Sequence, residues 1–405
     1  MVITLLVLIT AVFATDAIRD AVTLGSVGEG RLDISPGYLA IAPISNVLDT
    51  LTLLTVGQHI AILLTAIVAF IVVRVVRARN PRRMPTTVRR EVIATLSLLV
   101  GIVLTYAVGA LAFRPMARFV ASDPLVLAID FHAHTKYSHD GRAGWSEDDV
   151  RGWARGAGFD VVYITDHRTF EGGERGIASN PSQAGEGTML LQGIEAFYKG
   201  EHVNMLSAGR RFRGITTPDL KDIDEQSLAL ARLIPQTSPV MIETMPGKLD
   251  KVAATTPGVA AIEIVDGSPR GLTQTRRDRA RIVHLADSLN LALVTGSDNH
   301  GWGRAAPAWT LMRIPGWRGM ETDSLSARIE AILRDGRRES TRPVERTVAG
   351  ANNPLTLILS APLVIWTMFA TLGPDERVMW LVWTWGLVLA HRGWRRYRTR
   401  PRITA

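Results

Sequence analysis

Long apolar runs at both ends of the chain constrain its fold more than any other feature. Of the 405 residues, 47% are hydrophobic, and they gather in blocks. Four blocks approach the length of a membrane span, and a fifth is shorter. They are Met1 to Ala14, Leu51 to Val73, Val92 to Phe113, Leu355 to Leu372 and the short run Val378 to Ala390. We therefore expect an N-terminal membrane region over 1–115, one soluble domain over 116–352 and a C-terminal membrane region over 353–405.

The positive charge of the chain gathers beside these apolar runs. The formal net charge is +8, but from Arg114 to Asn352 the 30 Lys and Arg residues balance 30 Asp and Glu residues. The excess lies in two clusters without acids, Arg74, Arg77, Arg79, Arg82, Arg83, Arg89 and Arg90, and Arg392, Arg395, Arg396, Arg398, Arg400 and Arg402. Such clusters are typical of cytoplasmic membrane flanks, and they disfavour a domain-wide nucleic-acid footprint.

The charge pattern predicts the side of the membrane on which the soluble domain lies. If Arg74 to Arg90 is cytoplasmic, the run Val92 to Phe113 carries the chain outward. We expect a multi-pass protein of the cell membrane with an extracytoplasmic domain. Two alternatives stay open: Met1 to Ala14 is an anchor or a cleaved signal, and Val378 to Ala390 crosses the membrane or lies at its surface.

Strand-like runs alternate with helical ones inside the soluble part. The strand candidates are Leu125 to Ile129, Val161 to Thr165, Met189 to Leu191, Val203 to Leu206, Val240 to Ile242, Ala261 to Val265 and Leu291 to Val294. One helix is predicted to begin at Ser146, with Asp149 completing a capping pair, and another to run from Gln274 to Leu289. This alternation predicts a parallel α/β barrel with its site at the strand ends, and Glu171 to Gly187 reads as a mobile loop.

Metal-ligand residue types gather in two short motifs, although the chain has only nine histidines and no cysteine. The first motif is Asp130-Phe131-His132-Ala133-His134, followed by Ser138-His139-Asp140-Gly141, and the second is Gly296-Ser297-Asp298-Asn299-His300. Residues two apart on a strand share a face, which pairs His132 with His134 and Asp298 with His300. Further candidates, Asp140, His167, Glu195 and His202, stand at or near other strand ends. Imidazoles and carboxylates converging from several strands predict a site for divalent metal ions.

In content and order, these motifs resemble the PHP family, named for polymerase and histidinol phosphatase domains, over roughly Leu125 to Gly301. The resemblance implies a distorted (β/α)7 barrel, here with flanking transmembrane helices, that binds two or three divalent ions such as Mn, Zn or Fe. It implies phosphoester hydrolysis by a metal-bound hydroxide. The implied ligands are His132, His134, Asp140, His167, Glu195, His202, Asp298 and His300, with Glu195 as the bridge.

The chain departs from this family at one position. Where the family usually has a histidine before Pro-Gly, the sequence reads Glu243-Thr244-Met245-Pro246-Gly247. A thioether is a poor ligand for these ions, so either Glu243 substitutes or one metal position is weakened or empty.

Several neighbouring residues have alternative roles. His139 competes with Asp140 as a ligand, whereas Asp130 and Asp166 are expected to orient ligands. Residues placed to contact phosphate are Lys136, Arg168, Lys199 and Arg270. We expect Glu195, Asp298, Arg168 and Lys136 to act in catalysis. His59, inside an apolar run, is a candidate for a functional or an interfacial role.

The sequence thus predicts a membrane-anchored, metal-dependent phosphoesterase that acts on a phosphomonoester or a small phosphodiester. Its partners would be the lipid bilayer and a small phosphorylated substrate, with nucleic acid disfavoured by the neutral domain charge. Two alternatives are a nuclease that acts on nucleic acid ends and a non-catalytic membrane-bound sensor or scaffold, which the departure at Met245 keeps open.

Overall fold

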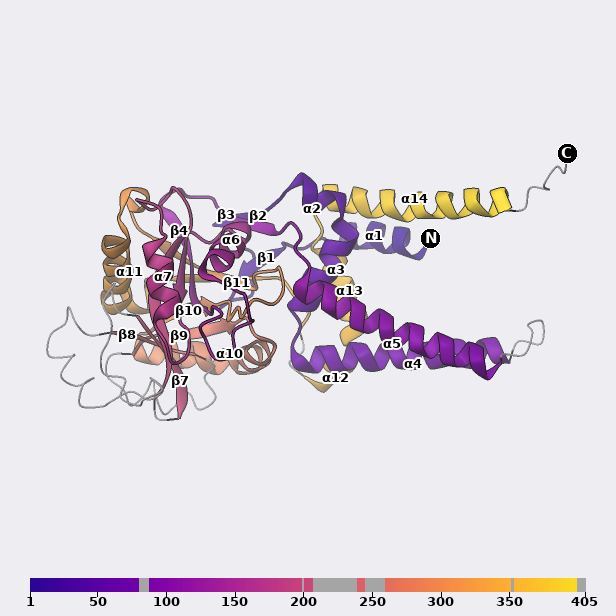
Figure 1. Ribbon diagram of the computed structural model, residues 1–405, viewed down its shortest axis with the longest axis horizontal. Helices are drawn as coiled ribbons and strands as arrows, with labels where there is room; N and C mark the ends of the chain where they lie inside the picture. The colour runs from indigo at the N-terminus through magenta and orange to yellow at the C-terminus, as the bar shows by residue number, and fades with distance from the viewer. Residues whose placement is uncertain (80–86, 199, 207–238, 245–258, 351–352, 399–405) are drawn as a thin grey trace.

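The computed structural model describes residues 1–79, 87–198, 200–206, 239–244, 259–350 and 353–398. Figure 1 shows two parts: a strand-rich body with covering helices, and a group of helices that project from one side of it. The projecting helices come from the apolar ends of the sequence, and the body comes mainly from its polar middle. The predicted domain limits at 115 and 353 themselves stay predictions.

A ten-stranded sheet in the described residues forms the body. Its strands, in spatial order, are β1 (Ile18–Asp20), β12 (Arg342–Arg346), β11 (Ala308–Arg313), β4 (Val126–Ala133), β5 (Val161–Ile164), β6 (Met189–Tyr198), β7 (Glu201–Leu206), β8 (Val240–Glu243), β9 (Val259–Asp266) and β10 (Ala292–Gly296). Strands β4, β5 and β6 are parallel to one another, as are β8, β9 and β10. Each of the seven predicted strands is present, so the mixed α/β class is confirmed.

The sheet curls until its last strand reaches β4. Beyond β10, Asp298 N donates to His132 O over 2.8 Å, and His134 N donates to Asn299 O over 3.1 Å. The half of β4 before these residues pairs instead with β11. The carboxyl ends of β4 and β10 therefore meet, which brings the two histidine-containing motifs together.

The prediction of a parallel sheet was wrong in two places. Strand β7 returns antiparallel to both β6 and β8, because β6 and β7 form a hairpin. Strands β11, β12 and β1 add an antiparallel extension at the β4 edge. Strand β1 comes from residues before the first long apolar helix, and β2 (Gly30–Ile34) pairs with β3 (Ala117–Ala121) in a separate two-stranded sheet.

Four longer helices cover the sheet: α6 (Glu147–Ala157), α7 (Glu171–Ala178), α10 (Pro269–Leu289) and α11 (Thr322–Gly336). Helix α6 begins where predicted, because Ser146 and Asp149 form a reciprocal capping box. Helix α10 begins at Pro269, five residues before its predicted start, with the Ser268 side chain as its cap. Helix α11 lies at the end of the body farthest from the projecting helices (Figure 1).

The prediction of a loop from Glu171 was wrong for its first half, which forms α7. Three glycines of this helix, Gly172, Gly173 and Gly176, are buried. A Cβ at Gly176 would lie 3.0 Å from the Leu190 side chain on β6. The glycines that made the segment look irregular therefore allow a helix to pack closely on the sheet.

The projecting part consists of helices, which the structure places at both ends of the chain. They are α1 (Val2–Val12), α2 (Pro36–Ala40), α3 (Ala42–Thr52), α4 (Val56–Ala78), α5 (Val88–Leu111), α12 (Pro354–Ile358), α13 (Ser360–Ala370) and α14 (Pro374–Arg398). In the part of the chain that the structure describes, α4 and α5 are long and apolar enough to cross a membrane, by length and composition.

Three of the predicted apolar segments differ in their limits from the helices that form. The span expected at Leu355 to Leu372 is divided into α12 and α13, because Pro362 lacks an amide hydrogen and lies in the first turn of α13. The short run Val378 to Ala390 belongs to α14, a continuous helix of 25 residues. The segment that was predicted to begin at Leu51 instead begins at Val56, after a capping box between Thr55 and Gln58.

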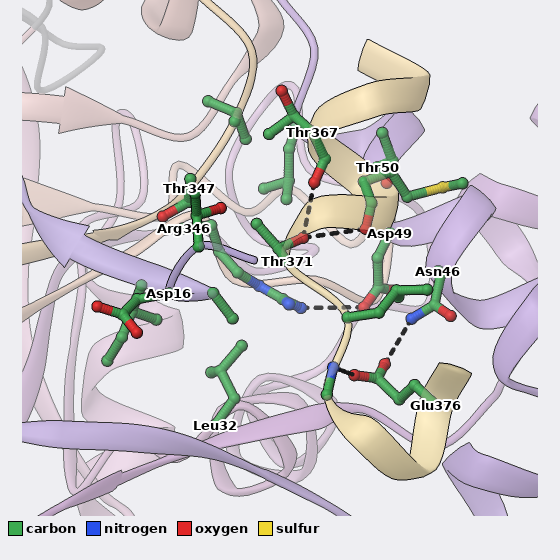
Figure 2. A pocket seen from close by; sticks show the side chains of 18 of the residues that line it. Asp16, Leu32, Asn46, Asp49, Thr50, Arg346, Thr347, Thr367, Thr371 and Glu376 are labelled. Atoms are coloured by element: carbon green, nitrogen blue, oxygen red, sulfur yellow. Dashed lines mark hydrogen bonds and ion pairs between the residues drawn. The ribbon is translucent and has the colours of Figure 1, made fainter. Parts of the chain in front are cut away.

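Buried charges join the helices to the body (Figure 2). Asp49 on α3 accepts hydrogen bonds from Tyr38, over 2.9 Å, and from Arg346 at the end of β12, also over 2.9 Å. Arg114, which follows α5, lies 2.5 Å from the same carboxylate. A cavity of about 340 Å³ adjoins this network. Because an unpaired buried charge is costly, the network fixes the helices against the sheet.

Candidate metal centre

The eight predicted ligands meet at one edge of the curled sheet, with Glu195 of β6 at the centre and His202 at the start of the antiparallel strand β7. Its Oε2 lies 3.0 Å from His132 Nε2, 3.3 Å from His134 Nε2 and 3.1 Å from His167 Nε2. Its Oε1 lies 2.5 Å from His202 Nδ1, across the hairpin of β6 and β7. One carboxylate thus faces four imidazoles, which is the position expected of a bridging ligand.

Asp298 and Asp140 place two more carboxylates beside some of these imidazoles and beside His300. Asp298 Oδ1 lies 3.2 Å from His134 Nε2 and 3.4 Å from His300 Nδ1. Asp140 Oδ2 lies 3.2 Å from His300 Nε2 and 3.6 Å from His167 Nε2. Of the alternatives His139 and Asp140, only Asp140 belongs to a converging group among the described residues. The residues come together as predicted, and their roles as ligands stay predictions.

The donor atoms fit divalent ions. Four groups contain the predicted residues, and the ligand atoms of each lie within 4.8 Å of one another. They are His132, His134 and Glu195; His134, Asp298 and His300; His134, Asp140 and His167; and His167, Glu195 and His202. His132 Nε2 and His134 Nε2 lie only 3.0 Å apart although both rings are buried. Facing imidazole nitrogens surrounded by carboxylate oxygens are the donor set of Zn, Mn or Fe sites.

The carboxylates change the proton affinity of the imidazoles. Burial alone would lower the pKa of His134, but hydrogen bonds to Asp298 and Glu195 outweigh it and raise the pKa to about 10. At His167, burial prevails over the attraction of Glu195 and lowers the pKa to about 4. A ligating imidazole must be deprotonated, so a metal ion would displace a proton from His134.

The sequence analysis missed two acids on β9, Glu263 and Asp266. Glu263 Oε1 lies 3.1 Å from His132 Nδ1, on the ring edge away from Glu195. Burial raises the pKa of Glu263 to about 7, although the charge of His132 opposes the shift. Asp266 joins Glu263 and His132 in a further group of converging ligand atoms. The available signal was an acid inside the apolar run of β9, because a buried acid requires a partner.

Asp130 and Asp166 accept hydrogen bonds from backbone amides near the predicted ligands, and their orienting role stays a prediction. Asp130 Oδ1 accepts from Ser297 N over 2.8 Å and from His132 N over 3.2 Å. Asp166 Oδ1 accepts from Thr135 N over 2.6 Å. Asp130 thereby ties the ligand segments after β10 and at the end of β4 to each other.

Unusual backbone conformations occur beside the ligands. Asp298 has φ of 44° and Arg168 has φ of 63°, in the left-handed region that side chains rarely adopt. Gly296 cannot carry a side chain, because a Cβ there would collide with Glu263 and with the Cβ of His132. Strained positions of this kind cost about 1–3 kcal/mol each and cluster at functional sites.

The residues that were predicted to contact phosphate differ in their surroundings. Arg168 lines a cavity of about 270 Å³ together with the predicted ligands Asp140, His167, Glu195 and His202. Lys136 is exposed, with its Nζ 5.1 Å from the ring centre of Tyr137, and Arg270 is exposed in the first turn of α10. Lys199 lies outside the described residues.

Only part of the segment that departs from the family pattern lies among the described residues. Glu243 is buried at the end of β8, and the converging groups found among the described residues do not include it. Met245 lies outside the described residues. Substitution by Glu243 therefore stays a prediction.

Comparison with solved structures finds partial likeness of fold. PsfC from Pseudomonas syringae PB-5123 is 18% identical, with 58% of this chain and 97% of that chain covered and a TM-score of 0.38. The lesion-specific endonuclease PfuEndoQ from Pyrococcus furiosus is 14% identical, with 53% and 57% covered and a TM-score of 0.39. A protein described as a metal-dependent phosphoesterase from Bifidobacterium adolescentis is 19% identical, with 49% and 93% covered and a TM-score of 0.28.

No family model matches the chain, and no curated protein matches it. The TM-scores with these solved structures indicate that only part of the chain path corresponds. What the site can do chemically is therefore inferred from the residues of this chain alone. The resemblance to the PHP family stays a prediction.

Proposed function

We propose that this protein is a membrane-anchored, metal-dependent phosphoesterase that hydrolyses a phosphomonoester or a small phosphodiester. The observation that carries the proposal is the position of Glu195, whose two oxygens lie within 3.3 Å of four imidazole nitrogens. Hydrogen bonding alone gives no reason to gather four imidazoles around one carboxylate, whereas adjacent metal ions can use all of these groups as ligands.

Two or three ions would share these residues, with Glu195 between them. When bound, divalent ions lower the pKa of water and neutralise charge on phosphate oxygens. The chain itself holds the ligands in place: Glu263 fixes the His132 ring, and Asp130 fixes the segment that carries Asp298. Arg168, in the cavity beside the ligands, is placed to bind a phosphate oxygen.

The arrangement of the helices supports a membrane position. Helix α4 has 23 residues and α5 has 24, and an α-helix of this length reaches about 35 Å, enough for a bilayer core of about 30 Å. The free ends of the α4 and α5 pair and of α14 point the same way, away from the body (Figure 1). The basic residues at the free end of the α4 and α5 pair and at the free end of α14 would then lie in the cytoplasm. The body would lie on the opposite side of the membrane.

The test is hydrolysis of an aryl phosphate by the full-length protein in detergent, with Mn²⁺ added after treatment with a chelator. We expect Mn²⁺-dependent turnover that His132→Ala or Asp298→Ala abolishes. Glu171→Gln, on the exposed side of α7, serves as a control and should retain it. Turnover that survives both ligand substitutions would overturn the proposal.

A further inference from the structure

A third cavity connects the candidate metal centre to the apolar helices. Its volume is about 430 Å³. On one side its wall contains the predicted ligands Asp140, Asp298 and His300, and on the other side it contains His59 of α4 and Thr105 and Tyr106 of α5. A ligand in this cavity would therefore touch the metal centre and the apolar helix pair together.

The two walls are fixed to each other. Gly303, three residues after His300, donates its amide to Ala110 O of α5 over 2.9 Å. Arg276 of α10 donates to Leu53 O, just before α4, over 3.0 Å. These hydrogen bonds fix the body against the helices α4 and α5 beside the cavity. The cavity is therefore part of the folded structure.

The cavity lies at a depth where lipid headgroups are expected. His59 is three residues after the start of α4, and Tyr106 is five before the end of α5, which places them about 5–8 Å inside the helix ends. His59 Nδ1 lies 2.8 Å from Tyr106 Oη, so the pair shares a hydrogen bond where the helices enter the bilayer. The headgroup layer has a similar thickness on each side of the bilayer core.

Exposed aromatic rings and half-buried arginines lie on the wall of this cavity and in an adjoining cavity that shares Ala110 and Gly303 with it. Trp302, on the cavity wall, is 53% exposed, and Phe113, just after α5, is 87% exposed. The guanidinium of Arg142 lies 5.7 Å from the Trp302 ring centre, and that of Arg304 lies 4.5 Å from the Phe113 ring centre. Aromatic rings are typical of membrane interfaces, and arginines there attract phosphate headgroups.

We propose that the substrate is a phosphate ester of a membrane lipid. The lipid would enter between Trp302 and Thr105, with its apolar chain against α4 and α5 and its phosphate at Asp140, Asp298 and His300. Water would form the new bond to phosphorus as the bond to the lipid oxygen breaks, and the lipid alcohol would keep one proton of the water. Asp140 also lines the cavity that contains Arg168, which gives the polar product a separate exit. This inference rests on the proposed phosphoesterase activity.

Activity in bilayers tests the inference. Full-length protein in nanodiscs with Mn²⁺ is given phosphatidic acid, phosphatidylglycerol or a soluble aryl phosphate. Turnover of either lipid supports the inference and distinguishes a monoester from a diester. Turnover of the aryl phosphate without either lipid would overturn it while leaving the proposed function intact. Failure with all three would overturn the proposed function.

Two substitutions on α5 test the route. Thr105→Trp narrows the mouth of the cavity, whereas Val103→Trp adds the same ring at an exposed position that does not line the cavity. We expect Thr105→Trp to lower the ratio of lipid to aryl phosphate turnover by about tenfold or more, because a small misplacement of the phosphate is costly. Val103→Trp should leave both rates unchanged. Equal ratios in the two variants would contradict the route.

Lipid binding gives a readout that does not depend on turnover. A photoreactive phosphonate analogue of phosphatidic acid, which cannot be hydrolysed, should label the cavity-facing segments of α4 and α5. Thr105→Trp should reduce this labelling, and Val103→Trp should not. Labelling that is spread evenly over both helices, or unchanged by Thr105→Trp, would overturn the inference even if the aryl phosphate is hydrolysed.

Discussion

Glu263 supports His132 from the side of the ring opposite Glu195. With Oε1 3.1 Å from His132 Nδ1, it fixes the ring so that Nε2 faces the site. Partners of this kind typically change metal affinity or activity by about 10- to 100-fold. Glu263 is therefore a positioning residue, which acts through His132.

We expect Glu263→Ala to weaken Mn²⁺ binding by about 10- to 100-fold. Glu263→Gln should recover most of this loss, because its amide oxygen can still accept a hydrogen bond from the ring. Titration of the chelator-treated protein with Mn²⁺ measures the affinity. Similar affinities for the Ala and Gln variants would contradict the positioning role.

The pKa of His134 predicts how metal affinity depends on pH. Since hydrogen bonds to Asp298 and Glu195 raise this pKa to about 10, the metal-free ring is protonated at neutral pH. For an ion that displaces this proton, the metal affinity should rise about tenfold for each unit of increase in pH between pH 6 and 8. Competition with a chelator of known proton affinity measures the slope. Affinity that does not change with pH would exclude proton displacement.

The convergence of the predicted ligands, and the positions of Asp130 and Asp166 beside them, could be predicted from the sequence, but the contact between Glu263 and His132 could not. His132, His134, Asp298 and His300 follow strand-like runs and share faces by the two-residue period of a strand. Glu263 has no such marker, because its partner His132 is 131 residues away along the chain and only the β9 position brings them together.

At the level of elements, local signals predicted α6 well. Ser146 and Asp149 cap its start, and Gly158 ends it with φ of 91°. Its buried face, Val150, Trp153, Ala154 and Ala157, follows the helical period. Since the signals lie within one segment, no tertiary information was needed.

Ser146→Ala should remove one cap hydrogen bond and lower the free energy of unfolding by about 1 kcal/mol. For a body of this size the melting temperature should fall by about 2–4 °C. Thermal unfolding of the full-length protein in detergent measures the change. The control is Ser288→Ala, on the exposed surface of α10, which should have little effect. Equal melting temperatures for the two variants would contradict the assigned role of the cap.

Other elements depend on distant contacts. Strand β1 has three residues and pairs with β12 more than 320 residues later, so it carries no pattern of its own. Helix α7 forms although three of its eight residues are glycine, because those glycines allow it to pack on β6. In both elements tertiary packing outweighs local propensity.

For the whole molecule, the position of α14 bears on whether the run Val378 to Ala390 crosses the membrane or lies at its surface. The C-terminal end of α14, the C-terminal end of α4 and the N-terminal end of α5 point the same way, away from the body (Figure 1). A common side of the membrane for the two arginine clusters stays a prediction.

The chain has no cysteine, so single introduced cysteines report topology directly. With a membrane-impermeant maleimide on intact cells, we expect labelling of Glu171→Cys on the body. We expect no labelling of Arg90→Cys in α5 or Tyr397→Cys in α14 until the cells are opened. The reverse pattern would place the body in the cytoplasm.

The count of bound metal ions tests the central claim most directly. Elemental analysis of the purified full-length protein should find two or three ions of Mn, Fe or Zn per chain. Glu195→Gln should lose at least one of them, because four imidazoles surround that carboxylate, and Glu171→Gln should lose none. One ion or none in the wild-type protein, or an unchanged count in Glu195→Gln, would contradict the account.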